Sequence, residues 1–403
     1  MARGTARRCL WFTTAALILR NNRALFSVAA GHFTVDYAAA LPTMMYPFLV
    51  VSLGLSYADV GVAAGTFTLA NSLIQPLFGY VGDRFGHRHV AAFGIVMQAA
   101  FIGSLAFVWN STSLIVLLAF AGIFTGMFHP VGAAVANRAA RTLKGASVGT
   151  FFIGGTLGFA ISPLIAAKIF EEFGLGYATF MIIPALAVGF AVFKFASAMP
   201  PSPSETNRGR ETTPYGPMDA RAAAILVWVV FFRSYAFAGT SVFIPLFIQL
   251  SGFSIQAGGL ALTLFMSGFA VGTLAGGTLA DRIGIKLVTV VSLALAGPLI
   301  LFFAYAPGSP IALVAIALAG LLLAGSFTPT IVMIQAQLPR RLGVATGVAL
   351  GFTFASGAVG QWATGGLADA LGFEIAFTIL AATPLIAALG GTLMAGARCG
   401  RNG

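Results

Sequence analysis

Long apolar stretches alternate with short polar segments along almost the whole chain. A helix needs roughly 20 apolar residues to cross a bilayer, and each of these stretches reaches that length. The pattern therefore predicts an all-α membrane protein with twelve transmembrane helices. We place the helices at residues 25–52, 57–81, 89–109, 112–137, 146–169, 177–198, 223–250, 255–280, 287–306, 310–337, 343–368 and 373–396.

A single long polar segment interrupts this pattern, at residues 200–219. It reads PPSPSETNRGRETTPYGPMD, and a segment rich in Pro, Ser, Thr and charge is typical of a flexible linker. We therefore expect two six-helix halves, at 25–198 and 223–396, joined by a linker at 199–222. The ends are a segment at 1–24, for which we expect a short cytoplasmic or interfacial helix rather than a signal peptide, and a tail at 397–403.

Composition agrees with a membrane location. The chain is 58% hydrophobic and 8% charged, with a mean hydropathy of +0.94, whereas soluble domains carry about 25% charged residues. The cysteines, Cys9 and Cys399, lie near opposite ends, which predicts no disulfide framework. We find no nucleophile or metal-ligand motif in the sequence, so we expect neither an enzyme, nor a metal site, nor a cofactor.

Basic residues fall almost entirely on one side of the predicted membrane. With the N-terminus inside, every Lys and Arg except Lys168 and Arg233 lies in a cytoplasmic segment. Because short cytoplasmic loops are enriched in basic residues, we expect both termini and the linker to be cytoplasmic. The net charge of +11 is then an orientation signal, and no basic patch predicts a nucleic-acid partner.

The two halves contain an internal repeat at an offset of 198 residues. The loop after the second span, Gly79-Tyr-Val-Gly-Asp83-Arg84-Phe-Gly86-His-Arg88, aligns with Gly277-Thr-Leu-Ala-Asp281-Arg282-Ile-Gly284-Ile-Lys286 after the eighth. Parallel repeats of this kind imply a pseudo-twofold axis along the membrane normal. They also predict a substrate site between the halves, near the bilayer midplane.

The first span carries two ionisable residues, His32 and Asp36. At about 1.5 Å per residue, Asp36 lies roughly 20 Å above Arg23, close to the midplane. A charge at that depth costs several kcal/mol and normally marks a transport pathway. The i, i+4 spacing places both side chains on one helix face.

The ionisable residues inside the spans break the repeat, because Asp36 aligns with Ser234 and Arg233 with Val35. Two hypotheses remain for Asp36: a carboxyl that carries a coupled proton, or a structural ion pair with Arg233. His32 either shares the proton or is a hydrogen-bonded packing residue.

Four further side chains are candidates for binding substrate. Arg233 is either an anchor for an anionic group or only the counter-ion of Asp36. His129 precedes Pro130, so a kink either aims it into the cavity or serves as a hinge without ligand contact. Gln75 and Gln335 either line the cavity or bond neighbouring helices.

The repeated loop resembles the signature of the major facilitator superfamily. Several pieces resemble its fosmidomycin-resistance branch more narrowly: His32-Phe-x-x-Asp36, Leu41-Pro42, Tyr46-Pro47, Gln75-Pro76, Phe128-His129-Pro130 and Ser162-Pro163. The fifth span resembles the glycine-rich antiporter motif of the superfamily, with Ser and Ala in place of three glycines.

This resemblance implies alternating access in a bacterial inner membrane, with small-molecule substrate, protons and lipid as partners of a monomer. It implies that spans 1, 4 and 7 line the cavity, and that the repeated loop gates it through Gly79, Asp83, Arg84, Gly86, Arg88, Gly277, Asp281, Arg282 and Gly284. We expect proton-coupled efflux of a small anionic or amphipathic compound, of which fosmidomycin-like drugs are the resembled example. Proton-linked uptake of an organic anion or sugar, and a lipid flippase on the same fold, are the alternatives.

Overall fold

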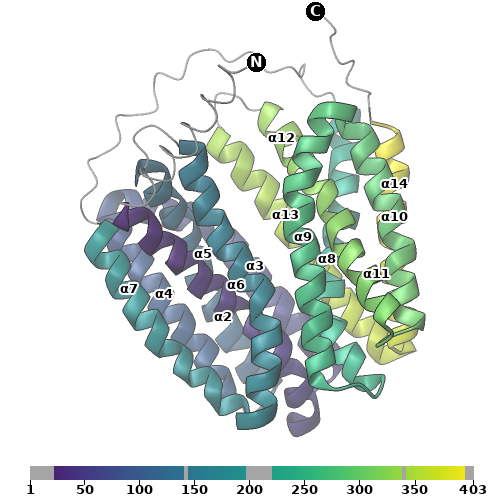
Figure 1. The fold of residues 1–403 in the computed structure, drawn as a ribbon, viewed down its shortest axis with the longest axis horizontal. Coiled ribbons are helices and arrows are strands. Elements are labelled where there is room, and N and C mark those ends of the chain that lie inside the picture. Colours follow the sequence, from purple (N-terminus) through teal and green to yellow (C-terminus); the bar gives the residue numbers. More distant parts are fainter. Residues whose placement is uncertain (1–21, 140–143, 197–219, 338–341, 395–403) are drawn as a thin grey trace, which may run out of the picture.

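The computed structural model describes residues 22–139, 144–196, 220–337 and 342–394, and these residues form helices without a strand. The first half contains α2 (Arg23–Leu53), α3 (Tyr57–Phe85), α4 (His87–Ser104), α5 (Ser111–Ala139), α6 (Lys144–Phe173) and α7 (Ile182–Phe195). Short 3-10 turns, Leu105–Phe107 and Leu175–Met181, extend α4 and precede α7. Figure 1 shows these helices gathered in one bundle.

The second half contains α8 (Ala220–Leu250), α9 (Ile255–Ile283), α10 (Ile285–Tyr305), α11 (Pro310–Gly325), α12 (Phe327–Gln337), α13 (Leu342–Leu371) and α14 (Phe373–Thr392). The bounds of α9 and α13 lie 198 residues after those of α3 and α6 at both ends. With α11 and α12 counted as one span, each half has six, and the predicted fold of two pseudo-symmetric six-helix halves is confirmed.

One predicted span differs from the structure. The span expected at 310–337 is divided at Ser326 into α11 and α12. Pro329 lies in the first turn of α12, where a missing backbone N–H is tolerated because that donor has no partner within its helix. In the first half, by contrast, Pro130 lies inside the continuous helix α5.

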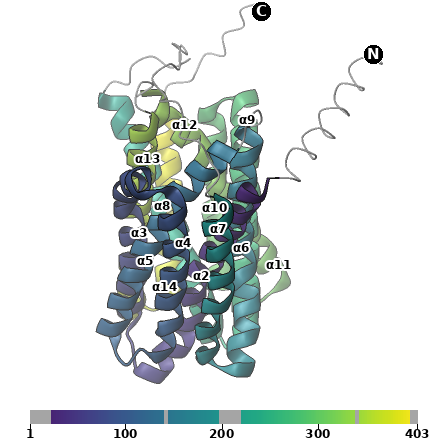
Figure 2. The same cartoon turned by 90° about the vertical axis from the view of Figure 1, so that its left-hand side faces the viewer.

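Ten helical segments of the described chain are long and apolar enough to cross a membrane. Helices α3 and α13 are not among them, and they pack against each other between the halves. Figure 2 shows the helices of both bundles running side by side from one face of the molecule to the other. We call the face where α2 begins and α14 ends the terminal face, and the opposite one the distal face.

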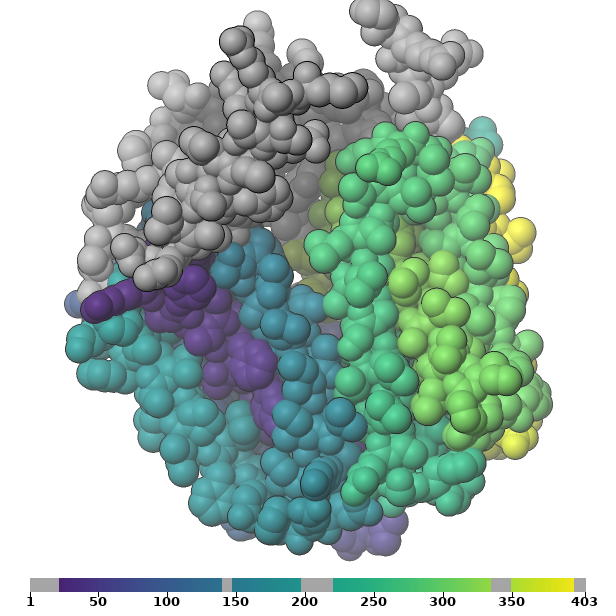
Figure 3. All heavy atoms as spheres, in the orientation of Figure 1, coloured from purple at the N-terminus to yellow at the C-terminus, as the bar shows by residue number. Residues whose placement is uncertain are grey.

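The halves meet near the distal face and diverge toward the terminal face (Figures 1 and 3). At the distal end, Asp369 of α13 accepts hydrogen bonds from the backbone N–H groups of Tyr57 and Ala58, at 2.9 and 2.8 Å. These are the first residues of α3, whose amides have no acceptor within their own helix. A carboxylate of one half therefore caps a helix of the other.

The pseudo-symmetric partner of Asp369 makes a related contact. Glu171 of α6 lies 198 residues earlier and accepts a hydrogen bond from Gln256 of α9. Between these two contacts and the middle of the molecule, both halves line a pocket. Its walls include Thr43, Tyr46 and Phe67 from the first half and Ser241, Met266 and Gln361 from the second.

We predict that Asp369→Ala favours an arrangement opened at the distal face. The change removes two hydrogen bonds to a charged group across the interface, worth roughly 1–2 kcal/mol together at this exposed site, or about 5- to 30-fold in a ratio of populations. A cysteine introduced at Thr43, with Cys9 and Cys399 replaced by Ser, reports opening through its labelling by a membrane-impermeant maleimide from the distal side.

The matched control is Asp59→Ala, because the Asp59 carboxylate caps the same end of α3 from within its own half. Labelling should accelerate for Asp369→Ala and stay at the parent rate for Asp59→Ala. Equal rates in both variants would mean that the contact across the halves does not hold the distal face closed.

Candidate functional site

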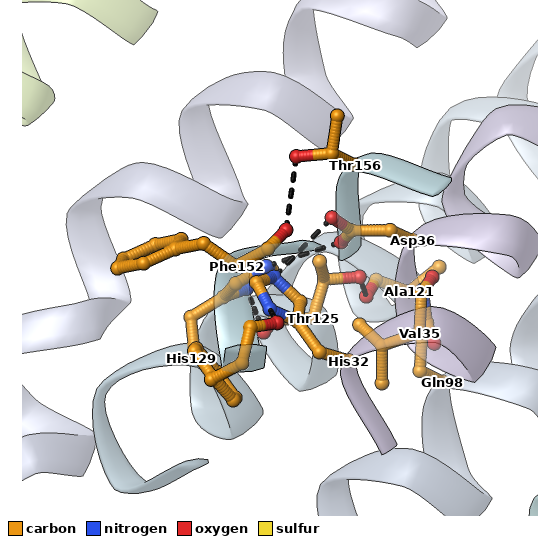
Figure 4. A network of polar contacts seen from close by, with 10 residues as sticks. His32, Val35, Asp36, Gln98, Ala121, Thr125, His129, Phe152 and Thr156 are labelled. Carbon is orange, nitrogen blue, oxygen red and sulfur yellow. Dashed lines mark hydrogen bonds and ion pairs between the residues drawn. The ribbon is translucent and has the colours of Figure 1, made fainter. Parts of the chain in front are cut away.

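Three side chains from two helices meet near the middle of the first half (Figure 4). His32 and Asp36 lie one turn apart on α2, and His129 comes from α5. The Asp36 carboxylate lies between the two rings: His32 Nε2 is 3.3 Å from Oδ2, and His129 Nε2 is 3.1 Å from Oδ1. We call these three residues the triad.

The second nitrogen of each imidazole contacts a backbone carbonyl. His32 Nδ1 lies 2.8 Å from the Phe151 carbonyl oxygen of α6, and His129 Nδ1 lies 2.8 Å from that of Thr125. A carbonyl oxygen only accepts, so each Nδ1 carries a hydrogen and donates it. These bonds fix the orientation of both rings and aim both Nε2 atoms at the carboxylate.

The members of the triad differ in exposure. The His32 side chain is 4% exposed and stacks on the Phe151 ring, with centroids 4.1 Å apart. Asp36 and His129 are more open, at 17% and 22%. A proton or ligand therefore reaches Asp36 and His129 first, and His32 lies behind them.

Glycines of α6 allow that helix to approach α2. A methyl group at Gly154 or Gly158 would overlap the backbone carbonyl oxygens of Ala29 and Phe33, and one at Gly155 would overlap His32 Nε2 and the Asp36 carboxylate. Ser162, one turn after Gly158, donates to the Tyr37 carbonyl at 2.7 Å.

The sequence shows this span to be glycine-rich, but two groups that form the site were not predicted from it. These are Gly155 and the Phe151 carbonyl. The glycine-rich pattern was the available signal for Gly155. The Phe151 carbonyl could not be predicted, because every residue type has a backbone carbonyl.

Arg233 lies elsewhere, inside the second half. Its side chain is 2% exposed, and the guanidinium lies over the Phe327 ring. The Nη2 atom donates to Ser234 Oγ at 3.1 Å and lies 3.5 Å from Thr353 Oγ1. Its Nε and Nη1 atoms have no partner among the described residues. In this conformation the partners of Asp36 are the two histidines, so the alternative of an Asp36–Arg233 ion pair is not the arrangement found.

The structure describes the side chain of only one of the two predicted glutamines. Gln75 is half-buried on α3, without a polar contact to these three residues. Gln335 belongs to α12, but its side chain falls outside the part of the chain that the structure describes.

The repeated loops follow the C-terminal ends of α3 and α9, on the terminal face. Asp83 is 3.3 Å from Arg138 Nη2 of α5 and 3.2 Å from His87 Nε2, so this loop connects three helices. Gly86 and Gly284 both follow their helices with positive φ angles, at 93° and 95°, a conformation that suits glycine. Nearby, Arg84 lies 3.4 Å from the Tyr80 hydroxyl, and Arg88 lies over the Phe193 ring. The remaining residues of the repeated loops lie near the C-terminal ends of α3 and α9: Gly79, Gly277, Asp281 and Arg282.

The triad also revises the expectation that the chain lacks a metal-ligand cluster. Its possible ligand atoms lie within 4.8 Å of one another, and imidazole nitrogen with carboxylate oxygen is a donor set that suits zinc and similar ions. No such group was visible in the sequence because His129 is separated from Asp36 by 93 residues. Chemically, the arrangement is able to hold protons or a cation.

We predict opposite effects on stability for two glycine substitutions in α6. Gly149→Ala meets open space and should be neutral or stabilising, since Ala is favoured over Gly in helices by roughly 1 kcal/mol. Gly155→Ala forces apart His32 and Asp36 and should cost roughly 1–3 kcal/mol. Thermal unfolding of purified protein, followed by tryptophan fluorescence, measures both. An unfolding temperature for Gly155→Ala equal to or above that of Gly149→Ala would contradict this packing.

Comparison with known proteins agrees with this architecture. The family model of the Major Facilitator Superfamily matches residues 28–260 and 226–396. The fosmidomycin resistance protein of Escherichia coli (strain K12) is 28% identical over 371 residues, which cover 91% of each chain. An uncharacterized MFS-type transporter of Bacillus subtilis (strain 168), YfnC, is 30% identical over 384 residues, again 91% of each.

A solved structure shares the fold at low sequence identity. It is a bacterial homolog of the human lysosomal transporter Spinster, in an inward-facing and unoccupied conformation, with a TM-score of 0.77 and 14% identity. The match covers 93% of this chain and 97% of that one. With the family model, the curated relatives and the architecture of two helical halves in agreement, this chain belongs to the Major Facilitator Superfamily and resembles its fosmidomycin-resistance branch.

Proposed function

We propose that the protein is a secondary active transporter that exports a small anionic or amphipathic compound in exchange for protons. The observation that carries this proposal is the triad. A carboxylate held between two imidazoles, at mid-length of a membrane helix, is a site where protons bind and leave. Because buried ionisable groups are costly at this depth, a purely structural role is a poor explanation for three of them together.

The terminal face is assigned to the cytoplasm in this proposal. Basic residues of the sequence concentrate in segments on that side, in line with the positive-inside rule. The helices of the two halves diverge toward the same face, so in this proposal the described conformation is assigned to the inward-facing state. In a bacterium this membrane is the inner membrane, and both termini are cytoplasmic.

The triad couples the two fluxes through competition. Protons on the triad and a substrate bound elsewhere in the protein compete when each favours a different opening of the two halves. Each ligand then shifts the inward-open and outward-open populations only by its difference in affinity for them. Contacts such as Asp369 to the start of α3 must break and reform in every cycle.

Arg233 is the proposed anchor for an anionic group of the substrate. Two of its nitrogens have no partner among the described residues while the side chain is buried, and a buried donor without an acceptor is normally rare. A guanidinium offers a fork of donors that matches phosphonate or carboxylate oxygens. The resemblance to a fosmidomycin resistance protein makes fosmidomycin the first compound to test.

Arg233 also favours a second candidate, proton-linked uptake of an organic anion. Loading protons on the triad adds positive charge to the interior of the protein, which strengthens the attraction of an anion. Binding of protons and anion would then be cooperative, and both would move in the same direction. The direction of proton movement decides between the two candidates.

We predict that Asp36→Asn abolishes proton coupling. In inverted membrane vesicles with an imposed pH gradient, fosmidomycin or another compound of a panel of anions and drugs should dissipate the gradient with wild type and fail to do so with Asp36→Asn. Asp59→Asn, which changes a carboxylate outside the triad, should behave as wild type. If Asp36→Asn dissipates the pH gradient at the wild-type rate, Asp36 has a structural role. If no compound dissipates the gradient with the wild-type protein, the proposal of efflux loses its support.

We predict that Arg233→Gln weakens anion transport without weakening the fold. Loss of a charge-assisted contact worth roughly 1.5–3 kcal/mol raises the half-saturating concentration of an anionic substrate by about 10- to 100-fold. The unfolding temperature should stay equal or rise, because a buried charge with two nitrogens unpartnered among the described residues is removed. Arg221→Gln, in the exposed first turn of the same helix, is the control. A lower unfolding temperature with unchanged transport would make Arg233 a structural residue.

A further inference from the structure

The donor atoms of the triad have the spacing of ligands that share a metal ion. His32 Nε2 lies 3.3 Å from Asp36 Oδ2, and His129 Nε2 lies 3.1 Å from Asp36 Oδ1. Two ligands bonded to one tetrahedral zinc ion at about 2.0–2.1 Å are roughly 3.3–3.4 Å apart. One donor atom from each residue lies within 4.8 Å of the other two, so side-chain adjustments of about 1 Å complete the set.

Hydrogen bonds to backbone carbonyls hold both imidazoles in the orientation that ligation needs. His32 Nδ1 donates to the Phe151 carbonyl and His129 Nδ1 to that of Thr125. Metal-ligating histidines usually donate their second N–H in this way, which fixes the tautomer and the direction of the ligand nitrogen. The contact of His32 with Asp36 is an ion-pair distance without a hydrogen bond, so the buried His32 Nε2 is available to a ligand.

Gly155 keeps the surroundings of two of these donors clear of side-chain atoms. A methyl group at this position would lie 2.5 Å from Asp36 Oδ2 and closer still to His32 Nε2. Such distances are far too short for a carbon atom, but they exceed zinc–ligand bond lengths by only a few tenths of an ångström. The region next to both donors therefore suits a small cation and excludes a methyl group.

We propose that the triad binds one zinc-class cation through His32 Nε2, His129 Nε2 and the Asp36 carboxylate. Asp36 and His129 are 17% and 22% exposed, so the fourth ligand position is open to water on their side. Two imidazoles favour Zn²⁺, Ni²⁺ or Co²⁺ over Mg²⁺ and Ca²⁺, which prefer oxygen ligands. The inference deepens the proposed function by naming a second ligand of the same site, and its consequence for transport rests on that function.

A second His–Asp pair in the chain lacks the features of this site. His87 Nε2 lies 3.2 Å from Asp83 Oδ1, again with i, i+4 spacing. Its third member is Arg138, whose Nη1 and Nη2 atoms lie 3.0 Å from His87 Nδ1 and 3.3 Å from Asp83 Oδ1. A guanidinium only donates, and its positive charge repels a metal cation. His87 is therefore a matched control for the histidines of the triad.

The proposed cation and the proposed transported protons use the same atoms. A bound ion occupies the Nε2 lone pairs and the carboxylate of the triad, so it prevents proton coupling at this site. All three ligands belong to α2 and α5 of the first half, so the ion does not tie the two halves together. We therefore expect Zn²⁺ to inhibit proton-coupled transport.

Isothermal titration calorimetry of the purified protein measures the binding of Zn²⁺. Cys9 and Cys399 are replaced by Ser, and purification uses a tag without histidine. We expect one Zn²⁺ per chain in this parent protein and no binding of Mg²⁺. The affinity should fall at least about 100-fold for His129→Gln, since loss of an outer-shell partner alone costs 10- to 100-fold. His87→Gln should keep the parent affinity.

X-ray absorption at the zinc edge of the loaded parent protein identifies the ligands and does not depend on whether a variant folds. We expect two imidazoles with oxygen ligands and no sulfur. Absence of saturable Zn²⁺ binding overturns the proposal, and so does a spectrum with one imidazole or none. Equal Zn²⁺ affinities of His129→Gln and the parent protein, both folded, overturn it as well.

A transport measurement separates this inference from the proposed function. In inverted vesicles, Zn²⁺ at ten times its measured dissociation constant should suppress the dissipation of the pH gradient by fosmidomycin by about 90%, in line with the occupancy of one site. Zinc bound by the triad without any inhibition would keep the metal site and refute proton coupling through the triad. Inhibition of a protein whose triad binds no zinc would overturn the metal site and leave the proposed function standing.

Discussion

The bond geometry around Asp36 is the constraint on which the site depends. Two imidazoles give their Nδ1 hydrogens to backbone carbonyls and so turn their remaining nitrogens toward one carboxylate. Those carbonyls belong to α5 and α6, so the proton binding that we propose on α2 is mechanically connected to two neighbouring helices. Gly155 makes the arrangement possible, because a larger residue would occupy the space of the carboxylate.

The helices and the contacts between the halves follow the internal repeat, whereas the ionisable residues inside the spans do not. Helices α9 and α13 repeat α3 and α6 at a constant offset, and Asp369 and Glu171 both reach across the halves from equivalent positions. The ionisable residues do not repeat: the counterpart of Asp36 is Ser234, and that of Arg233 is Val35. A scaffold that rocks between two openings benefits from equivalent halves, while the proposed proton site and the proposed anion anchor each need only one copy.

The sequence predicted the helices within a few residues and the fold class entirely, because apolar length and loop charge dominate in a membrane. It also placed His32 and Asp36 on one face, since their spacing is local. From the sequence, His129 was a candidate for binding substrate and not a partner of Asp36. The contact between His129 and Asp36 depends on the rotation of α5 about its axis, which the hydrophobic pattern does not predict. The break at Ser326, the packing of Arg233 against the Phe327 ring and the contact of Asp369 with α3 depend on tertiary packing in the same way.

The central claim is that the triad drives transport rather than forming the substrate pocket, and counterflow tests it most directly. Proteoliposomes loaded with unlabelled fosmidomycin are placed in labelled fosmidomycin at equal pH on both sides, where exchange needs no net proton movement. We predict that Asp36→Asn exchanges label at close to the wild-type rate although it no longer uses a pH gradient. Loss of exchange in a folded, correctly inserted Asp36→Asn protein would contradict the account, because Asp36 would then be required for binding or for the conformational change itself.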